Sequence, residues 1–204
     1  MNAQLTIPAV TYAGEGSIEK LRDIIRSEDA KSILVFTDKG IRSFGLSARV
    51  EAICAEEGTL KIVDDLTAEP AVSDIERVMR EVEADRPDLI VGLGGGSVMD
   101  AAKLASILIG ADYTLRDLLA DATLAQKQVK SVMVPTTCGT GSEATCNAIV
   151  AIPEEESKKG IVNNCMISDY VILDVQMIAK LPPKIIAATG VDALAHCVEC
   201  YTSK

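Results

Sequence analysis

The sequence lacks any hydrophobic run long enough to cross a membrane, since no apolar stretch approaches the ~20 residues that a bilayer-spanning helix needs. Its first ten residues, MNAQLTIPAV, have neither the basic region nor the apolar core of a secretory signal peptide. Basic residues are also scarce: 20 Lys and Arg stand against 30 Asp and Glu, a net charge of −10. This charge argues against unspecific binding to nucleic acid or an anionic membrane. We therefore expect a soluble, cytoplasmic protein with no nucleic-acid or membrane partner.

Cysteine and histidine are few, which excludes two classes of small domain. The six cysteines are scattered through apolar or helical sequence, without the density of a secreted disulfide scaffold, and this fits a reducing compartment. Cys197 and Cys200 form one CxxC pair, but a zinc ribbon requires a second pair and the sequence has none. Two small side chains one helical turn apart are the simpler interpretation. His196 is the single histidine.

What the sequence does contain is a regular alternation of short apolar runs with helical segments. A chain of 204 residues is long enough to bury a sizeable core. Continuous runs such as SILVF are typical of parallel strands that are buried on both faces. Alternating strands and helices predict right-handed crossovers and a doubly wound, mainly parallel Rossmann-like α/β sheet. The predicted strands are 10–12, 32–36, 60–63, 89–93 and 132–134, and the predicted helices include 17–26, 46–57, 73–84 and 97–109.

The segment LIVGLGGGSVMDAAK, residues 89–103, carries the clearest chemical signal. A strand ends in Gly94, Gly95 and Gly96, and Ser97 stands at or near the start of the next helix, where it is expected to act as the cap. Free backbone N–H groups and the positive end of the helix dipole then point into a gap without side chains. This arrangement predicts an anion site, most commonly for phosphate.

One alternative to this interpretation stays open, and the familiar phosphate-loop patterns do not decide between the two. The glycines could serve only to allow positive φ and close helix packing at a tight turn. Neither familiar phosphate-loop pattern fits, because a Walker loop would end in Gly-Lys-Ser/Thr, and the G-x-G-x-x-G fingerprint would place its third glycine where Ser97 stands.

Two other loops follow predicted strands and belong to the same edge of the sheet. Ligands of such sheets bind beyond the carboxyl ends of the strands. Asp38 follows the second strand and could accept the hydroxyls of an adenosine ribose, which favours NAD over NADP; an Asx turn or helix cap is an equal alternative. After the fifth strand, hydroxyl residues surround two glycines, which suits a loop lying along a phosphate and ribose, or simply a polar turn: Thr136, Thr137, Thr140 and Ser142.

The pattern changes at Pro182 and Pro183, and we place a domain boundary near Leu181, giving an α/β domain over 1–181 and the first helix of an all-α domain over 182–204. Asp192 and His196 are four residues apart, so they lie on one helical face. This pair could share Fe(II) or Zn(II) through its oxygen and nitrogen donors, although an ordinary Asp–His helix pair is the simpler alternative.

Three motifs in this order resemble the iron-containing alcohol dehydrogenase family, whose fold is shared with glycerol dehydrogenase and dehydroquinate synthase. They are GGGSVMDAAK (94–103), PTTCGTGSEAT (135–145) and ATGVDALAHCVECYTS (188–203). The resemblance implies a cofactor site for NAD whose residues are Asp38 at the adenosine ribose, Gly94, Gly95, Gly96 and Ser97 at the pyrophosphate, Thr136, Thr137 and Thr145 in the cleft, and Lys158 at the nicotinamide ribose.

The same resemblance makes Asp192 and His196 the first two of four iron ligands, the other two being histidines further along the family's helical domain. Glu69 stands where many members have an asparagine that touches the cofactor. The implied activity is metal-assisted hydride transfer between a small alcohol or aldehyde and NAD, in a possible homodimer, with no separate protein nucleophile. The alternatives are a glycerol dehydrogenase or maleylacetate reductase of the same fold, and a non-catalytic nucleotide-binding module.

Overall fold

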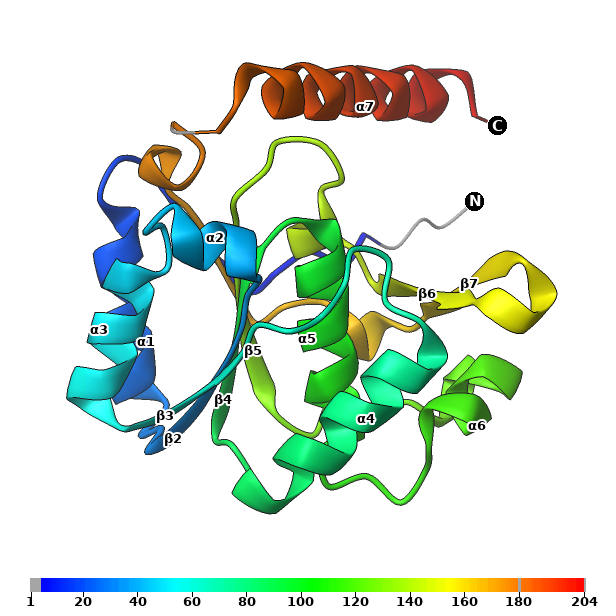
Figure 1. Cartoon of the computed structure of the whole chain (residues 1–204), viewed down its shortest axis with the longest axis horizontal. Helices are drawn as coiled ribbons and strands as arrows, with labels where there is room; N and C mark the ends of the chain where they lie inside the picture. Colours follow the sequence, from blue (N-terminus) through cyan, green and yellow to red (C-terminus); the bar gives the residue numbers. More distant parts are fainter. Residues whose placement is uncertain (1–4, 180, 204) are drawn as a thin grey trace.

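The computed structural model describes residues 5–179 and 181–203. The expectation about the first ten residues therefore rests partly on 1–4, which lie outside the described residues. At the centre is a six-stranded sheet in which every neighbouring pair is parallel (Figure 1). The strands, in spatial order, are β1 (Val10–Ala13), β8 (Tyr170–Leu173), β5 (Lys130–Pro135), β4 (Leu89–Gly94), β2 (Ser32–Phe36) and β3 (Thr59–Val63).

The central strands are apolar along their whole length because helices cover both of their faces. All six residues of β4 are buried, as are the last four of β2. In register, Ile33 lies opposite Leu89 and Phe36 opposite Gly92. The predicted parallel α/β fold is thereby confirmed.

Helices form one layer on each side of this sheet (Figure 1). The first layer holds α1 (Lys20–Ser27) and α3 (Ala48–Glu57), whose apolar side chains share one core with Val35, Leu93 and Val134 of the sheet. The second holds α4 (Val72–Val82), α5 (Gly96–Leu108) and α6 (Leu115–Ala120), which share the other core with Leu34 and Ile90. Alternate side chains of one strand thus enter opposite cores, as the pleat requires.

The order of the strands reverses between β2 and β4. After β2 the chain passes to the first helix layer, and after β4 it passes through α5 to the second. The short helix α2 (Lys39–Ser43), which the sequence pattern did not indicate, directly follows β2. A crevice forms where two neighbouring strands send their connections to opposite faces, and ligands of such sheets bind there.

Smaller elements complete the described part of the chain. A two-stranded antiparallel hairpin, β6 (Asn147–Ile152) and β7 (Ser157–Val162), extends beside α6 (Figure 1). Short 3-10 turns occur at Ser17–Glu19, Glu83–Asp85, Ala122–Leu124, Ser142–Ala144, Pro153–Glu155, Asn164–Met166 and Val175–Met177.

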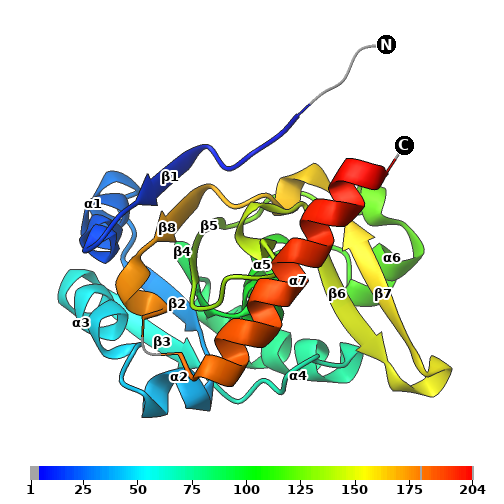
Figure 2. The same cartoon turned by 90° about the horizontal axis from the view of Figure 1, so that it is seen from above.

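The last helix, α7 (Pro183–Thr202), crosses above the carboxyl edge of the sheet (Figures 1 and 2). None of its residues is buried, and apolar side chains such as Val191 and Leu194 are exposed by more than 60%. In the described ranges, no helix combines the length and apolarity that crossing a bilayer requires.

Candidate functional site

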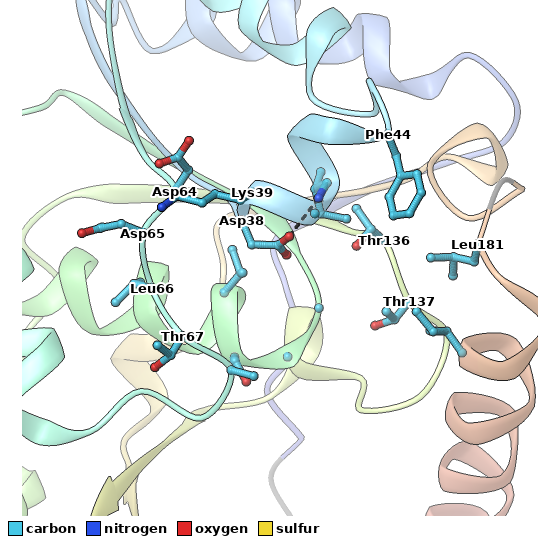
Figure 3. A pocket seen from close by; sticks show the side chains of 18 of the residues that line it. Asp38, Lys39, Phe44, Asp64, Asp65, Leu66, Thr67, Thr136, Thr137 and Leu181 are labelled. Atoms are coloured by element: carbon cyan, nitrogen blue, oxygen red, sulfur yellow. Dashed lines mark hydrogen bonds between the residues drawn. The ribbon is translucent and has the colours of Figure 1, made fainter.

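A cavity of about 650 Å³ lies at the carboxyl ends of β2, β4 and β5, at the crevice between β2 and β4. Its walls are the loops after these strands and residues 64–68 after β3, and Leu181 and Pro182 before α7 line it together with Ile185 in the first turn of α7. Figure 3 shows Asp64 and Asp65 on one side of Asp38, with Thr136, Thr137 and Leu181 on the other. The cavity lining includes six of the nine predicted cofactor residues: Asp38, Gly95, Gly96, Ser97, Thr136 and Thr137.

None of the three glycines at the junction of β4 and α5 serves positive φ, and two of them, Gly94 and Gly96, serve close packing. Gly94 ends β4, Gly95 is the residue before α5, and Gly96 is its first residue. None of the three has a positive φ, so the alternative based on left-handed backbone is wrong. A Cβ on Gly94 would lie 2.7–2.9 Å from three atoms of Val98, and a Cβ on Gly96 would lie 3.0 Å from Cγ2 of Thr140. Bare backbone therefore lines this part of the cavity.

The predicted capping role of Ser97 is wrong. The N-cap of α5 is Gly95, which has no side chain to bond the first turn, and Ser97 is already the second helical residue. Its Oγ instead accepts a hydrogen bond from the backbone N–H of Glu69 at 3.3 Å. The first N–H groups of α5, as in any α-helix, have no acceptor within the helix, and here no side chain caps them either. These groups and the positive end of the helix dipole face the cavity.

Asp38 caps a helix and also lines the cavity. Its Oδ1 accepts a hydrogen bond from the N–H of Ile41 at 2.8 Å, so the helix-cap interpretation is confirmed. The same residue lines the cavity, one strand away from the glycines. A cap uses one carboxylate oxygen, which leaves the other for a ligand.

Two further carboxylates, Asp64 and Asp65, line the cavity near Asp38. Asp64 pairs with Arg42 at 2.5 Å and Asp65 pairs with Arg77 at 2.8 Å. Sequence reasoning did not select them, because a pair of acidic residues after a strand is a common surface feature. They lie near Asp38 because β2 and β3 are neighbouring strands of the sheet.

The loop after β5 supplies a hydroxyl that has no partner among the described residues. Thr136 is fully buried, its backbone N–H donates to the carbonyl of Gly94 at 3.0 Å, and its Oγ1 makes no hydrogen bond. The neighbouring Thr137 lies close to Gly95, and both residues line the cavity. A buried hydroxyl without a partner is costly, so Thr136 indicates a position that a polar ligand atom or a water would fill.

Thr145 and Lys158 lie outside the lining of this cavity. The Oγ1 of Thr145 accepts a hydrogen bond from Lys103 Nζ at 3.1 Å, behind the loop. Lys158 is on β7, where its Nζ pairs with Glu69 Oε1 at 2.7 Å. Since Glu69 also contacts Ser97, this ion pair stands next to the start of α5. Their assignment to the cofactor stays a prediction.

Asp100 and Lys103 form a buried ion pair that the sequence pattern did not single out as functional. Lys103 Nζ lies 2.9 Å from Asp100 Oδ1, and the lysine side chain is completely buried. Burial lowers the pKa of Lys103 from its ordinary value, while the Asp100 carboxylate acts in the opposite direction. The pair joins α5 to the loop after β5.

Asp192 and His196 lie on one face of α7, as the spacing predicts, with Oδ1 and Nδ1 3.7 Å apart. Their carboxylate and imidazole suit Fe(II) or Zn(II). In the described residues, however, no group of three or more His, Cys, Asp or Glu side chains could hold a metal ion. Two donors that are about half exposed do not make a stable site by themselves.

The loop after β5 touches α7 beside this pair. A Cβ on Gly139 would lie 3.0 Å from Thr189 and 3.1 Å from Asp192 Oδ2. Gly139 therefore lets the loop and the helix approach closely, which places Asp192 next to one wall of the cavity. All six cysteines are free thiols, and Cys197 and Cys200 are exposed on the same helix.

A model of the family described as iron-containing alcohol dehydrogenase matches residues 8–175, which is most of the chain. The chain belongs to the iron-containing alcohol dehydrogenase family. It is 34% identical, over 98% of its length, to long-chain-alcohol dehydrogenase 1 of Geobacillus thermodenitrificans, and the match covers 51% of that protein. The chain thus spans about half the length of the curated relatives it matches.

Solved structures of this family have the same fold. A crystal structure of 1,3-propanediol oxidoreductase aligns with a TM-score of 0.92 and 28% identity, over 98% of this chain and 53% of the other. Sulfoacetaldehyde reductase from Bifidobacterium kashiwanohense, crystallised in complex with NAD+, aligns with a TM-score of 0.89 and 26% identity, again over 98% and 53%. The resemblance carried by the three sequence motifs is confirmed.

Proposed function

We propose that the cavity binds NAD and that the chain serves an NAD-dependent oxidoreductase that interconverts a small alcohol and its aldehyde or ketone. The observation that carries this proposal is the uncapped start of α5, which opens into a cavity at the crevice between β2 and β4. Membership of the iron-containing alcohol dehydrogenase family, and a relative crystallised with NAD+, support the choice of ligand.

The pyrophosphate would lie against Gly95, Gly96 and Ser97. The amides of the first turn of α5 donate to phosphate oxygens, and the helix dipole favours their negative charge. The unpartnered Oγ1 of Thr136 supplies a further hydroxyl on the facing wall. A volume of about 650 Å³ is within the range of cofactor pockets.

The adenosine ribose would lie at Asp38, whose second carboxylate oxygen accepts from the ribose hydroxyls. Asp64 and Asp65 add negative charge on the same side. Each of these two is paired with an arginine, so it is chiefly the Asp38 carboxylate that would disfavour the 2′-phosphate of NADP. We therefore assign NAD and not NADP as the preferred nucleotide.

Bound NAD would supply a hydride acceptor at its nicotinamide ring. Leu181, Pro182 and Ile185 add apolar surface on one side of the cavity, which would shield part of the bound nucleotide from water. We assign Lys158 to the nicotinamide-side ribose, a contact for which its bond to Glu69 must loosen. Thr145 would act behind the loop, through Lys103, and not by direct contact.

The described residues do not complete a metal site, so we derive no step through a metal. Asp192 and His196 would be two of its ligands and would need donors from outside the described residues. Because the described residues supply only these two donors, we keep a second candidate function, a nucleotide-binding module without turnover of its own.

Calorimetric titration of the 204-residue chain with NAD and NADP, with and without Fe(II), tests the proposal. We expect NAD to bind more tightly than NADP, and Asp38→Asn to narrow this preference because the ribose acceptor loses its charge. Gly160→Ala is a matched control, since a methyl there meets no atom within 4 Å. Absence of binding by either nucleotide would refute the proposal.

An assay of alcohol-dependent NADH formation separates the two candidate functions. We expect this chain to bind NAD with little or no turnover, because the donors present do not form a metal site. Sustained turnover by the 204-residue chain would refute the module interpretation.

A further inference from the structure

The side chain of Lys103 is completely enclosed, although it carries an ammonium group. Its Nζ lies 3.0 Å from the carbonyl oxygen of Ser142, 3.1 Å from Thr145 Oγ1, 2.5 Å from the carbonyl oxygen of Asn147 and 2.9 Å from Asp100 Oδ1. An ammonium has three N–H donors, so these oxygens use its full capacity. Every partner except Asp100 belongs to one segment, residues 142–147.

Asp100 reinforces the same connection. It accepts hydrogen bonds from Ser142 Oγ at 2.5 Å and from the N–H of Ile149 at 3.0 Å. The buried pair therefore joins the middle of α5 to the far end of the loop after β5. The near end of that loop is held by the bond from Thr136 N–H to the carbonyl of Gly94.

Between these two attachments, the loop forms the wall of the cavity that faces the start of α5. Thr140 lies so close to Gly96 that an added Cβ would be 3.0 Å away, and Thr137 lies 3.6 Å from the corresponding position on Gly95. The loop and the start of α5 are thus so close that a Cβ on Gly96 would crowd Thr140, and the absence of that atom keeps the space between them open. A small shift of the loop would close this space or move Thr136 away from it.

We propose that Lys103 is a positioning residue for the dinucleotide site. By binding residues 142–147, it sets the distance between the threonine hydroxyls of the loop after β5 and the uncapped start of α5. This inference rests on the proposed function. It gives Lys103 no contact with the nucleotide, since the residue does not line the cavity. It also accounts for a cation in this interior, where an apolar residue of the same volume would pack without a desolvation penalty.

The experiment compares Lys103→Met, Asp100→Asn and Thr145→Val with the unchanged chain. Lys127→Met is a control, because Lys127 is a partly buried lysine that, like Lys103, bonds a carbonyl, that of Ile167, and a carboxylate, that of Asp169. These contacts stand before β5 and β8, at the edge of the sheet opposite the cavity. Each variant is characterised by its thermal midpoint, by amide hydrogen exchange without nucleotide, and by its Kd for NAD.

We expect Lys103→Met to speed exchange over residues 136–149 by on the order of tenfold, while β2 amides keep their protection. Its Kd for NAD, measured well below the thermal midpoint, should rise by about 100-fold, the cost of displacing binding groups by an ångström. Thr145→Val should change both quantities in the same direction but less, because it removes one contact without leaving a buried charge unpaired.

A purely structural role would lower the midpoint of Lys103→Met and leave the Kd of the folded protein unchanged, and this result would overturn the inference. If Lys103→Met fails to fold, Thr145→Val and Asp100→Asn decide, and a Kd unchanged in both overturns it as well. Failure of the unchanged chain to bind NAD is a distinct result that refutes the proposed function. An effect of Lys127→Met on the Kd as large as that of Lys103→Met would also count against the specific role of Lys103.

Discussion

Gly95→Ala separates the demands of folding from those of ligand binding at the start of α5. Gly95 has φ −79° and ψ −173°, a backbone conformation that alanine adopts readily. The new methyl would lie 3.6 Å from Cγ2 and Oγ1 of Thr137, an ordinary van der Waals contact. We therefore expect the free energy of unfolding to stay within about 0.5 kcal/mol of the original.

The same methyl would stand in the cavity beside Gly96 and Ser97, whose amides would bind a phosphate in the proposed function. If the phosphate loses one charge-assisted hydrogen bond to these amides, binding weakens by about 1.5–3 kcal/mol. This corresponds to a Kd for NAD that is roughly 10- to 150-fold higher. The expected outcome is a protein of normal stability that has lost most of its affinity.

Urea denaturation and calorimetric titration on the same preparations measure both quantities. Gly160→Ala again provides the control, since its methyl points into open space on β7 and should leave the Kd and the urea midpoint unchanged. A Gly95→Ala protein that binds NAD as tightly as the unchanged chain would refute the position of the pyrophosphate. A large loss of stability would instead show that the site tolerates no methyl for packing reasons.

Three further predictions concern packing at the site and an ion-pair cluster between α1 and α3. Gly94→Ala should cost about 1–3 kcal/mol of stability, because its methyl would overlap Val98; an unchanged urea midpoint would contradict this. Arg26 and then Arg22 bond the Glu57 carboxylate and lower its pKa from 4.5 to about 2, so its contribution is complete above pH 4.5 and lost as the pH falls through 2. The stability advantage over Glu57→Gln, measured by urea denaturation at several pH values, should therefore shrink between pH 4.5 and 2, and a constant difference would contradict the ion pairs. Gly139→Ala should push α7 from the loop and speed its amide exchange while β4 stays protected; unchanged exchange would mean that the contact is not a constraint.

Local pattern was sufficient to predict the central strands and the start of α5. Buried parallel strands require continuous apolar runs, and residues 32–36 and 89–93 have them, so β2 and most of β4 were predicted from composition alone. Short elements were missed, because five or six residues, as in α2 and α6, carry too little periodicity. The sequence also did not show why glycine is needed at positions 94–96. Whether Gly94 serves φ or packing depends on Val98, whose distance only the folded helix defines.

The sequence by itself determined the fold class, the family, and the three loops that carry chemistry, because apolar period and glycine placement are local properties of a chain. Only the tertiary structure decided what each side chain does within those loops. In the structure, Asp38 caps α2 and also lines the cavity, and Ser97 caps no helix. Thr145 lies outside the cavity lining and bonds Lys103. The tertiary structure also brought Lys103 to oxygens about 40 residues away along the chain. Such contacts are decided by how helices and loops pack across a sheet, and no spacing within one segment encodes them.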